Sequence, residues 1–368
     1  MAGVNDGVLV HLTEPTAWRA GLDVGVLRPP SLATEGFVYL STPEQVHLPA
    51  ARLFPGRRDL VLLVVDRDRL REDPLLGPLA SSGTPWRGPH LHGPLPVSAV
   101  VAVVPYRPPA EPDLPAPEDA LGRALALQLS LRVRRAAEVR DVPGGVAVRD
   151  PRYPHSRDDN RLLLSSPVDA GTIEQVTAAV AADAGWPHRA ATLRWAGAGT
   201  VAAQLARRGW EVLELLVMAR AAEPLPGGER AEVVPQEEVH GLWERSWRRD
   251  LPAGADLDEV VTQLVGREHR NDAVVAVSDV VVREGAAVVS AGQLRVDGAT
   301  AAVESVVTEP GARGRGHADA VLARLLTSAA DAGCDLVVLE ADAADWPQHW
   351  YTRRGFRVVG STWEVAAS

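Results

Sequence analysis

The sequence has no lysine, one cysteine and no long apolar run. Because all 38 basic residues are arginine, the chain offers no side-chain amine for acylation. The single Cys334 excludes an intramolecular disulfide and argues against a thiolate metal cluster. No segment approaches the roughly 18 apolar residues of a membrane-spanning helix, and the N-terminus lacks a basic region followed by an apolar run. We therefore expect a cytoplasmic protein that does not span a membrane.

Positive charge is also in deficit. The formal net charge is −10 at pH 7, which argues against a nucleic-acid partner held by phosphate contacts. Charged residues make up 23% and hydrophobic residues 46% of the 368 positions, a balance typical of soluble globular proteins. We expect a chain of this length to form two or three domains.

Two proline-rich, polar stretches divide the sequence. The first, RPPAEPDLPAPED at residues 107–119, contains five prolines, which neither a helix nor a strand accommodates. The second, AEPLPGGER, covers residues 222–230. These stretches predict a small α+β domain at 1–106, a linker at 107–120, a middle lobe at 121–222 and a C-terminal domain at 223–368.

The C-terminal part has the clearest pattern of elements. Apolar residues at helical spacing predict a helix at 239–250 and a second one that follows the acidic cap at Asp256. Asp297-Gly298 predicts a hairpin turn. The elements expected next are strands at 273–282, 286–296 and 299–307, a glycine-rich loop, a helix at 317–332, the strand LVVLEA, a short helix through Tyr351 and a last strand from Phe356.

The middle part repeats the last four of these elements. It contains a helix from Thr172 to Ala184, the strand ATLRW, the helix TVAAQLARRG and the strand WEVLELLVMA. The helix starts at Thr172 and His317 lie 145 positions apart, and the closing glycines Gly209 and Gly355 lie 146 apart. A helix that ends on Arg-Arg-Gly is ordinary by itself, because a basic last turn and a following glycine are common. The nearly constant offset predicts one supersecondary unit used twice.

The loop before the C-terminal helix has the composition of an anion-binding turn. It reads Arg-Gly-Arg-Gly-His-Ala from Arg313 to Ala318. Glycines let successive backbone N–H groups face one concavity, and the helix N-terminus adds positive potential. The loop lacks the Gly-Lys-Ser/Thr of a Walker motif and the glycine pattern of dinucleotide sites. It therefore predicts a pyrophosphate site of another kind, with a tight, solvated basic loop as the alternative.

On these residues, the segment from about 230 to 368 resembles the GNAT (Gcn5-related N-acetyltransferase) superfamily. The signature of that family is Arg or Gln, two variable residues, Gly, one variable residue, and Gly or Ala. It is matched here by Arg313, Gly314, Arg315, Gly316, His317 and Ala318. A late tyrosine followed by Gly-Phe is matched by Tyr351 and Gly355-Phe356. With the middle lobe, the resemblance implies an α/β (α+β) fold with two GNAT-like mixed-sheet lobes over about residues 121–368.

The resemblance implies direct transfer of an acyl group from acetyl-CoA to the amine of a small-molecule or peptide acceptor, without a metal. It implies that the backbone of Val306 and Val307 holds the pantetheine arm, and that the loop 313–318 holds the pyrophosphate. Relatives often carry Asn seven residues before the tyrosine. Ala344 stands at that position here, which leaves this coenzyme contact in doubt.

Two side chains are candidates for the proton transfers. Tyr351 is the candidate acid for the thiolate, and packing beside Trp350 is its alternative role. Glu304 is the candidate base for the amine, directly or through water. Its alternatives are a solvated strand face and an ion pair with an arginine.

Aromatic residues and the middle lobe add weaker indications. Trp243 and Trp247 are candidate acceptor-binding residues because the first GNAT helices border the acceptor site, and the alternative is a core position. In the middle lobe, Leu205 stands where the repeat would place Tyr351, and SSPVDAGT replaces the basic loop. The middle lobe is therefore predicted to be a scaffold without the chemistry. Its Asp158-Asp159-Asn160 segment forms a capped turn or, alternatively, faces the acceptor.

The N-terminal part resembles, over about residues 8–104, a family catalogued as domain of unknown function 952. The resemblance is carried by Gly36-Phe37, Ser41 and the segment PHLHGP that begins at Pro89. It implies a fold related to the ADP-ribosyltransferases, with a cleft lined by His11, Thr13, Ser41 and His90. His90 and His92 have the spacing of a metal pair, but no third ligand is evident. Residues 75–89 contain no glutamate, which weakens the case for transferase catalysis.

Three functional hypotheses follow. The first is an acetyl-CoA-dependent N-acetyltransferase whose C-terminal domain binds the coenzyme. The second is a regulatory module that binds coenzyme A without turnover. The third gives the N-terminal domain an NAD- or RNA-directed transferase activity of its own. The sequence indicates neither the acceptor nor the oligomeric state.

Overall fold

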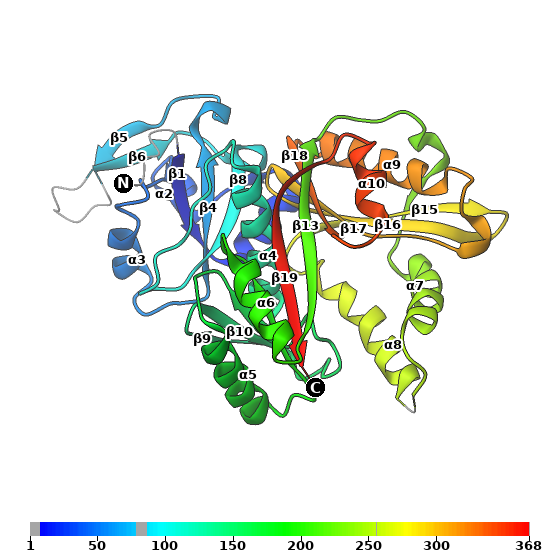
Figure 1. The fold of residues 1–368 in the computed structure, drawn as a ribbon. Coiled ribbons are helices and arrows are strands. Elements are labelled where there is room, and N and C mark those ends of the chain that lie inside the picture. Colours follow the sequence, from blue (N-terminus) through cyan, green and yellow to red (C-terminus); the bar gives the residue numbers. More distant parts are fainter. Residues whose placement is uncertain (1–7, 79–86, 255, 368) are drawn as a thin grey trace.

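The computed structural model describes residues 8–78, 87–254 and 256–367. A small N-terminal α+β unit lies beside one large mixed sheet that is covered by helices (Figure 1). This architecture confirms the predicted fold class. The first seven residues of the predicted N-terminal domain lie outside the described part, and the domain limits at 106, 120 and 222 stay predictions.

The N-terminal unit is organised around β4 (Leu60–Asp66), a continuous apolar strand whose residues 60–65 are all buried. β4 pairs antiparallel with β1 (Val8–Thr13) on one side and with β8 (Val100–Tyr106) on the other. Two small sheets, β2–β7 and β3–β6–β5, complete the unit. The remaining elements are α1 (Pro15–Val24), β2 (Val26–Leu27), α2 (Pro30–Thr34), β3 (Val38–Tyr39), α3 (His47–Leu53), β5 (Leu75–Pro78), β6 (Arg87–Leu91) and β7 (Leu95–Pro96).

The rest of the chain forms one eleven-stranded sheet with the order β14-β15-β16-β17-β18-β13-β19-β12-β11-β10-β9. The middle lobe contributes α4 (Ala120–Arg135), β9 (Glu138–Val142), β10 (Gly145–Arg149), β11 (Arg161–Leu164), α5 (Ala170–Ala184), β12 (Arg189–Leu193), α6 (Ala198–Arg207) and β13 (Glu211–Ala221). The C-terminal lobe contributes β14 (Glu232–Val234), α7 (Glu237–Asp250), α8 (Leu257–Gly266), β15 (Ala276–Glu284), β16 (Ala287–Asp297), β17 (Thr300–Thr308), α9 (His317–Asp331), β18 (Leu336–Asp342), α10 (Pro347–Thr352) and β19 (Arg357–Ala367).

The predicted repeat is present in the order of elements. The series β11-α5-β12-α6-β13 matches β17-α9-β18-α10-β19, and the first two strands of each series pair in parallel. The helix of the first series begins at Ala170, two residues before the predicted start. The reason is that Asp169 caps it, accepting a hydrogen bond from the backbone N–H of Thr172 at 3.0 Å.

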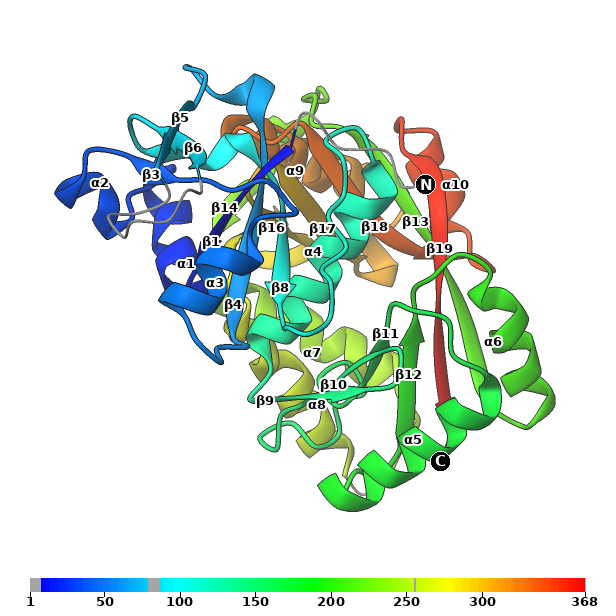
Figure 2. The ribbon, with the colours of Figure 1, turned by 90° about the vertical axis from the view of Figure 1, so that its left-hand side faces the viewer.

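The last strand of each repeat is exchanged between the lobes. β13 lies between β18 and β19, whereas β19 lies between β13 and β12. The two strands pair antiparallel along their length, from Glu211 opposite Ala366 to Ala219 opposite Arg357. They are the two long strands at the centre of the view in Figure 1, and in Figure 2 they lie toward the right-hand side. The lobes therefore share one continuous sheet across the predicted boundary at residue 222.

Alternation of side chains along the strands assigns the helices to two faces of the sheet. Val303 and Val337 belong to the core under α9, whereas their neighbours Ala302 and Val338 pack with α4. α7 and α8 cover Val281 on the same face as α4. In the middle lobe α5 and α6 cover the face opposite α4.

Asp297 joins the N-terminal unit to both lobes. Its Oδ1 accepts a hydrogen bond from Trp18 Nε1 of α1 at 2.7 Å, and its other oxygen pairs with Arg134 of α4. The Arg134 and Asp297 side chains are 2% and 1% exposed. Gly298 follows in the predicted hairpin turn with φ +80°, and a Cβ there would lie 2.2 Å from the Val100 carbonyl oxygen. Only glycine fits this close approach of β8.

A second buried carboxylate lies between the sheet and α7. Asp279 of β15 is 4% exposed and accepts a hydrogen bond from Gln293 Nε2 at 2.9 Å. Burial raises the pKa of Asp279 to about 6. The hydrogen bonds from Gln293 and Gln236 favour the charged carboxylate but offset only part of this effect.

None of the helices in the described ranges has both the length and the hydrophobicity of a membrane span.

Asp297→Ala is expected to lower the free energy of unfolding by about 3–5 kcal/mol, because it leaves the buried Arg134 guanidinium without its partner. Urea denaturation at pH 7 measures the change. Asp59→Ala, which removes an exposed partner of Arg57, serves as the control and should change stability by less than about 1 kcal/mol. Similar small effects of both substitutions would contradict the role given to Asp297.

Asp279→Asn is expected to stabilise the protein at pH 7 by about 1–3 kcal/mol. Asp279 binds its proton more tightly in the folded chain than in the unfolded chain. Its favourable contribution is therefore present below its unfolded pKa and is lost as the pH rises through about 6. Denaturation at pH 4 and pH 7 should show the advantage of the variant only at the higher pH. An equal effect at both values would argue against the raised pKa.

Candidate functional site

A cleft of about 490 Å³ opens where the sheet splits beside α9 and α10. β17 and β18 pair in parallel only from Thr300 to Ala302, whereas β13 pairs with the other side of β18 along its whole length. The end of β17 therefore has a free edge toward the cleft. The lining comprises Ser246, Arg249, Asp250, Val306, Val307, Thr308, Ala312, Arg313, Gly314, Gly316, His317, Ala318, Asp319, Trp346, Pro347, Trp350, Tyr351 and Arg354.

A bulge directs the end of β17 into the cleft. The pairing of β16 with β17 shifts between Ala291 and Gln293, and Ser305 on the opposite strand has φ +53°. Val306 and Val307, predicted to hold the pantetheine arm, follow this bulge and line the cleft. The Val307 carbonyl already accepts a hydrogen bond from the Ser290 hydroxyl at 2.9 Å.

The predicted loop forms the N-terminal end of α9. Gly314 and Gly316 have φ of +77° and +76°, and Gly316 is the N-cap of the helix. These left-handed conformations turn the backbone so that the first amides of α9 face outward at the positive end of the helix dipole. The Arg313 guanidinium lies over the loop and donates to the Thr308 carbonyl at 3.2 Å.

Arg315 is the one residue of the predicted loop that does not line the cleft. Its Nη1 pairs with both carboxylate oxygens of Glu284, at 2.8 and 2.9 Å. His317 Nε2 lies 2.8 Å from the same carboxylate. Hydrogen bonds from Arg315 and His317 lower the pKa of Glu284. Glu284 thus anchors the loop from β15, a contact that the sequence did not indicate.

Tyr351 and Glu304 lie close enough to interact electrostatically. Burial raises the pKa of the Tyr351 hydroxyl, and the negative charge of Glu304 raises it further. The phenol therefore keeps its proton at neutral pH. The Tyr351 ring packs edge-on against Trp350 and Phe356, with centroids 4.7 and 5.5 Å apart.

Glu304 combines exposure with a loose arginine contact. Its side chain is 38% exposed, and Oε1 lies 3.9 Å from Arg295 Nη1. Arg295 is held more tightly by Glu268, at 2.7 Å. The geometry fits both the candidate base and the arginine partner considered from the sequence, so the role of Glu304 as base stays a prediction.

Four tryptophans of the C-terminal lobe separate into two pairs. Trp243 is buried and, with the partly buried Trp247, packs in the core between α7, α8 and the sheet. Neither lines the cleft described above, so their positions fit the core alternative. Trp346 and Trp350 line the cleft instead, and Trp346 is 61% exposed at its rim.

Arg249 and Arg354 also line the cleft, and the sequence did not indicate either of them. Arg354 pairs with Asp319 at the start of α9, and its guanidinium lies 4.0 Å from the centroid of the Trp350 ring. Arg249 lies 3.6 Å from Glu309. Arg354 belongs to the Arg353-Arg354-Gly355 segment, whose basic residues indicate only a helix end in the sequence.

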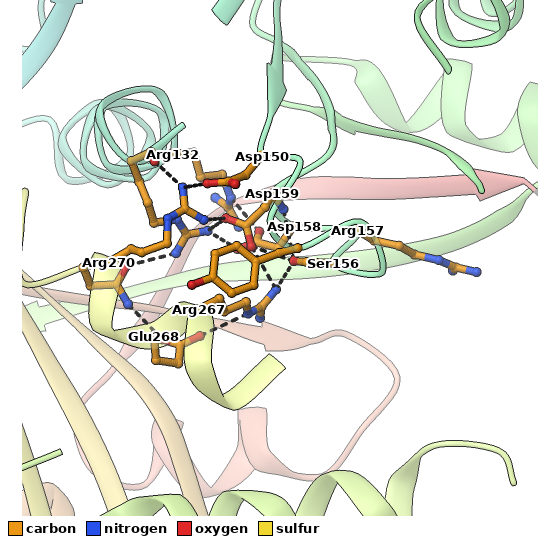
Figure 3. Close-up of polar contacts among 12 residues, drawn as sticks. Arg132, Asp150, Ser156, Arg157, Asp158, Asp159, Arg267, Glu268 and Arg270 are labelled. Carbon is orange, nitrogen blue, oxygen red and sulfur yellow. Dashed lines mark hydrogen bonds and ion pairs between the residues drawn. The ribbon is translucent and has the colours of Figure 1, made fainter. Parts of the chain in front are cut away.

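In the middle lobe, Leu205 is fully buried in the core around α5 and α6. Asp158 and Asp159 lie in a turn, in which the Ser156 hydroxyl accepts a hydrogen bond from the Asp159 N–H, and they also belong to a charge network between the lobes (Figure 3). Burial alone would raise the pKa of Asp158, but Arg132 and Arg135 hold it well below its usual range. Asp159 pairs with Arg135, Arg267 and Arg270, at 3.0, 3.6 and 3.0 Å.

The four N-terminal cleft candidates lie near one another and are all buried. His11 Nδ1 lies 2.8 Å from the Tyr39 carbonyl oxygen, and His90 is the strand partner of Tyr39. Ser41 pairs with Val10 of β1, three residues before Thr13. Exposed fractions are 7% for His11 and Thr13, 6% for Ser41 and 4% for His90. A cleft lined by them stays a prediction, and residues 79–86 of the adjoining connection are not described.

Within the described ranges, no group of three or more His, Cys, Asp or Glu side chains is arranged to hold a metal ion.

Solved structures share parts of this fold. A functionally unknown conserved protein from Staphylococcus epidermidis matches with a TM-score of 0.52 at 12% identity, over 63% of this chain and 93% of its own. A GCN5-related N-acetyltransferase from Kribbella flavida matches with a TM-score of 0.46 at 18% identity, over 67% and 95%. Protein CC0527 from Caulobacter crescentus is 34% identical over 29% of this chain and 94% of its own, with a TM-score of 0.25. No curated protein matches the chain.

Two family models match separate segments. One is described as protein of unknown function (DUF952) and the other as the acetyltransferase (GNAT) family. The second segment contains the bulge, the basic loop and Tyr351. The chain therefore carries a segment similar to the DUF952 family, at residues 12–103, and a segment similar to the GNAT acetyltransferase family, at residues 237–356.

Proposed function

We propose that the protein is an acetyl-CoA-dependent N-acetyltransferase that transfers the acetyl group directly to an acceptor amine. The observation that carries the proposal is the cleft itself. It combines a glycine-rich helix N-terminus, a free strand edge and a protonated tyrosine near a carboxylate. The match of residues 237–356 to the acetyltransferase family supports this chemistry.

The cleft residues fit a pyrophosphate followed by an amide-containing arm. Arg313 and the first amides of α9 supply donors to an anion, and the bulged edge of β17 supplies backbone groups to amides. His317 lines the cleft with a buried Nδ1 that has no hydrogen-bond partner in the described ranges. Such an orphaned polar atom is costly unless a ligand satisfies it.

The proposed reaction needs two proton transfers. The acceptor amine, once deprotonated, attacks the thioester carbonyl, a C–N bond forms and the C–S bond breaks. Glu304, directly or through water, accepts the proton that leaves the amine nitrogen. Tyr351 donates its proton to the departing sulfur, a role that suits a phenol kept protonated by burial and by the neighbouring negative charge.

The middle lobe has a structural part in this proposal. β13 pairs with β18 on the side away from β17, along the whole of β18, so the middle lobe supports the part of the sheet beside which the cleft forms. We assign to it the support of the acceptor side, without catalytic residues of its own, because Leu205 stands in place of Tyr351.

Acetyl-CoA at millimolar concentration is expected to raise the melting temperature of the full chain, with a stabilisation of about 3 kcal/mol at 100 times its Kd. Arg313→Ala combined with Arg315→Ala should abolish the shift, because the first change removes a direct anion donor and the second frees the loop from Glu284. The control, Arg71→Ala with Arg207→Ala, removes the same charge at two exposed sites. No shift in the unaltered protein would refute the coenzyme site.

Tyr351→Phe is expected to lower the rate of coenzyme A release by about 10²–10⁴-fold, measured with acetyl-CoA and a panel of primary amines and peptide N-termini. Its acetyl-CoA-induced shift in melting temperature should match that of the unaltered protein, because the phenol hydroxyl acts on the leaving sulfur. Tyr153→Phe in the middle lobe is the matched control. Tight binding without turnover over the whole panel would favour a coenzyme-binding regulatory module instead.

A further inference from the structure

A second cavity, of about 830 Å³, lies between the proline-rich linker, α4 and the strands β9, β10 and β11. It shares no lining residue with the coenzyme cleft. Residues 109–113 of the linker form one wall of the cavity, so the linker also contributes to the folded structure. The volume falls in the range of small-molecule sites, about 300–1,000 Å³.

The inner walls of the cavity are apolar. Ala126, Leu129 and Val133 recur at helical spacing on one side of α4 and face it. Val146 of β10 and Leu163 of β11 form the opposite wall, and both are buried. These surfaces suit a hydrocarbon or aromatic body rather than a sugar or a nucleotide.

Arg194, at the end of β12, is an unpaired cation in this apolar wall. Arg194 is 5% exposed, and its Nη2 donates a hydrogen bond to the Leu125 carbonyl. Its Nε and Nη1 have no hydrogen-bond partner among the residues that the structure describes. Two buried arginine side chains of α4 differ: Arg134 and Arg135 each have a carboxylate partner, Asp297 and Asp158 respectively.

The missing partner has an energetic consequence. Burial, and next the charge of Arg132, lower the pKa of the Arg194 guanidinium to about 9. Arg194 is therefore still cationic at neutral pH. The charges of Glu340 and Asp113 offset the effect of burial only in part, and its Nε and Nη1 lack hydrogen-bond partners among the described residues, which is unfavourable. An anion that enters the cavity would offset this cost.

The remaining charges restrict the charge of that anion. Asp141 is already held by Arg58 and Arg107. Glu111 and Asp113 are exposed and line the cavity on the linker side. Their negative charge would repel a dianion or polyphosphate, but it tolerates a single charge that reaches Arg194.

We propose that this cavity binds a small monocarboxylate with an apolar body. The carboxylate accepts hydrogen bonds from the Arg194 guanidinium, and the apolar body lies between α4 and the β10–β11 wall. The site is separate from the acetyltransferase chemistry and does not depend on it.

Octanoate and octan-1-ol, which differ in the anionic head, are suitable probes for calorimetric titration of the full chain. We expect octanoate to bind about tenfold more tightly than octanol, because a charge-assisted hydrogen bond forms only with the carboxylate. In Arg194→Met the two probes should bind equally, and the unliganded variant should melt at a higher temperature because an unpaired buried charge is gone. Arg207→Met at an exposed site is the matched control.

A second variant tests the cavity without touching Arg194. Leu129→Trp should fill the space from α4 and weaken both probes, whereas Arg313→Ala with Arg315→Ala should leave octanoate binding unchanged. Equal affinity for the two probes in the unaltered protein, or undiminished octanoate binding in both cavity variants, would overturn the proposal. Absence of octanoate binding at millimolar concentration would overturn it as well.

Discussion

The antiparallel pairing of β13 with β19 is the constraint on which the rest of the larger sheet depends. β13 ends the first repeat but lies beside β18 of the second, and β19 ends the second repeat but lies beside β12 of the first. Neither lobe therefore has a complete sheet by itself. On the other side of β18, pairing with β17 ends at Ala302. The free edge of β17, the bulge and the start of α9 meet there at one cleft. The sheet beside the cleft is thus completed by a strand that ends 85 residues before Val306.

All ion pairs that would use lysine or arginine are made by arginine in this fold, since no lysine is present. A guanidinium can bond several oxygens at once, and the interior uses that property repeatedly. Arg135 contacts Asp158, Asp159 and the side chain of Asn271. The resulting network, shown in Figure 3, ties α4 and the 150–160 loop to the turn after α8. Asp158, which has several arginine partners, and Asp279, which has only glutamine partners, consequently differ in the direction of their pKa shifts.

Local signals predicted the glycine-rich loop before α9, the short helix that contains Tyr351 and the Asp297-Gly298 turn, because each depends on residues adjacent in the chain. The repeat was also visible, since helix starts and closing glycines recur at a nearly constant offset. The exchange of β13 and β19 was not predictable, because both strands are equally suited to either neighbour. Helical spacing alone could not say which tryptophans reach the cleft. That Arg194 Nε and Nη1 lack hydrogen-bond partners among the described residues likewise depends on distant elements, which no short motif records.

The exchanged strands also describe how such a chain can be assembled. Two copies of a single-lobed protein that traded their last strands would form a homodimer with this sheet order. Joining the copies end to end gives one polypeptide in which the partner is always present. Once the partner is covalent, only one copy needs a phosphate loop and a tyrosine. The other copy is then free to lose them, provided that it still delivers its strand.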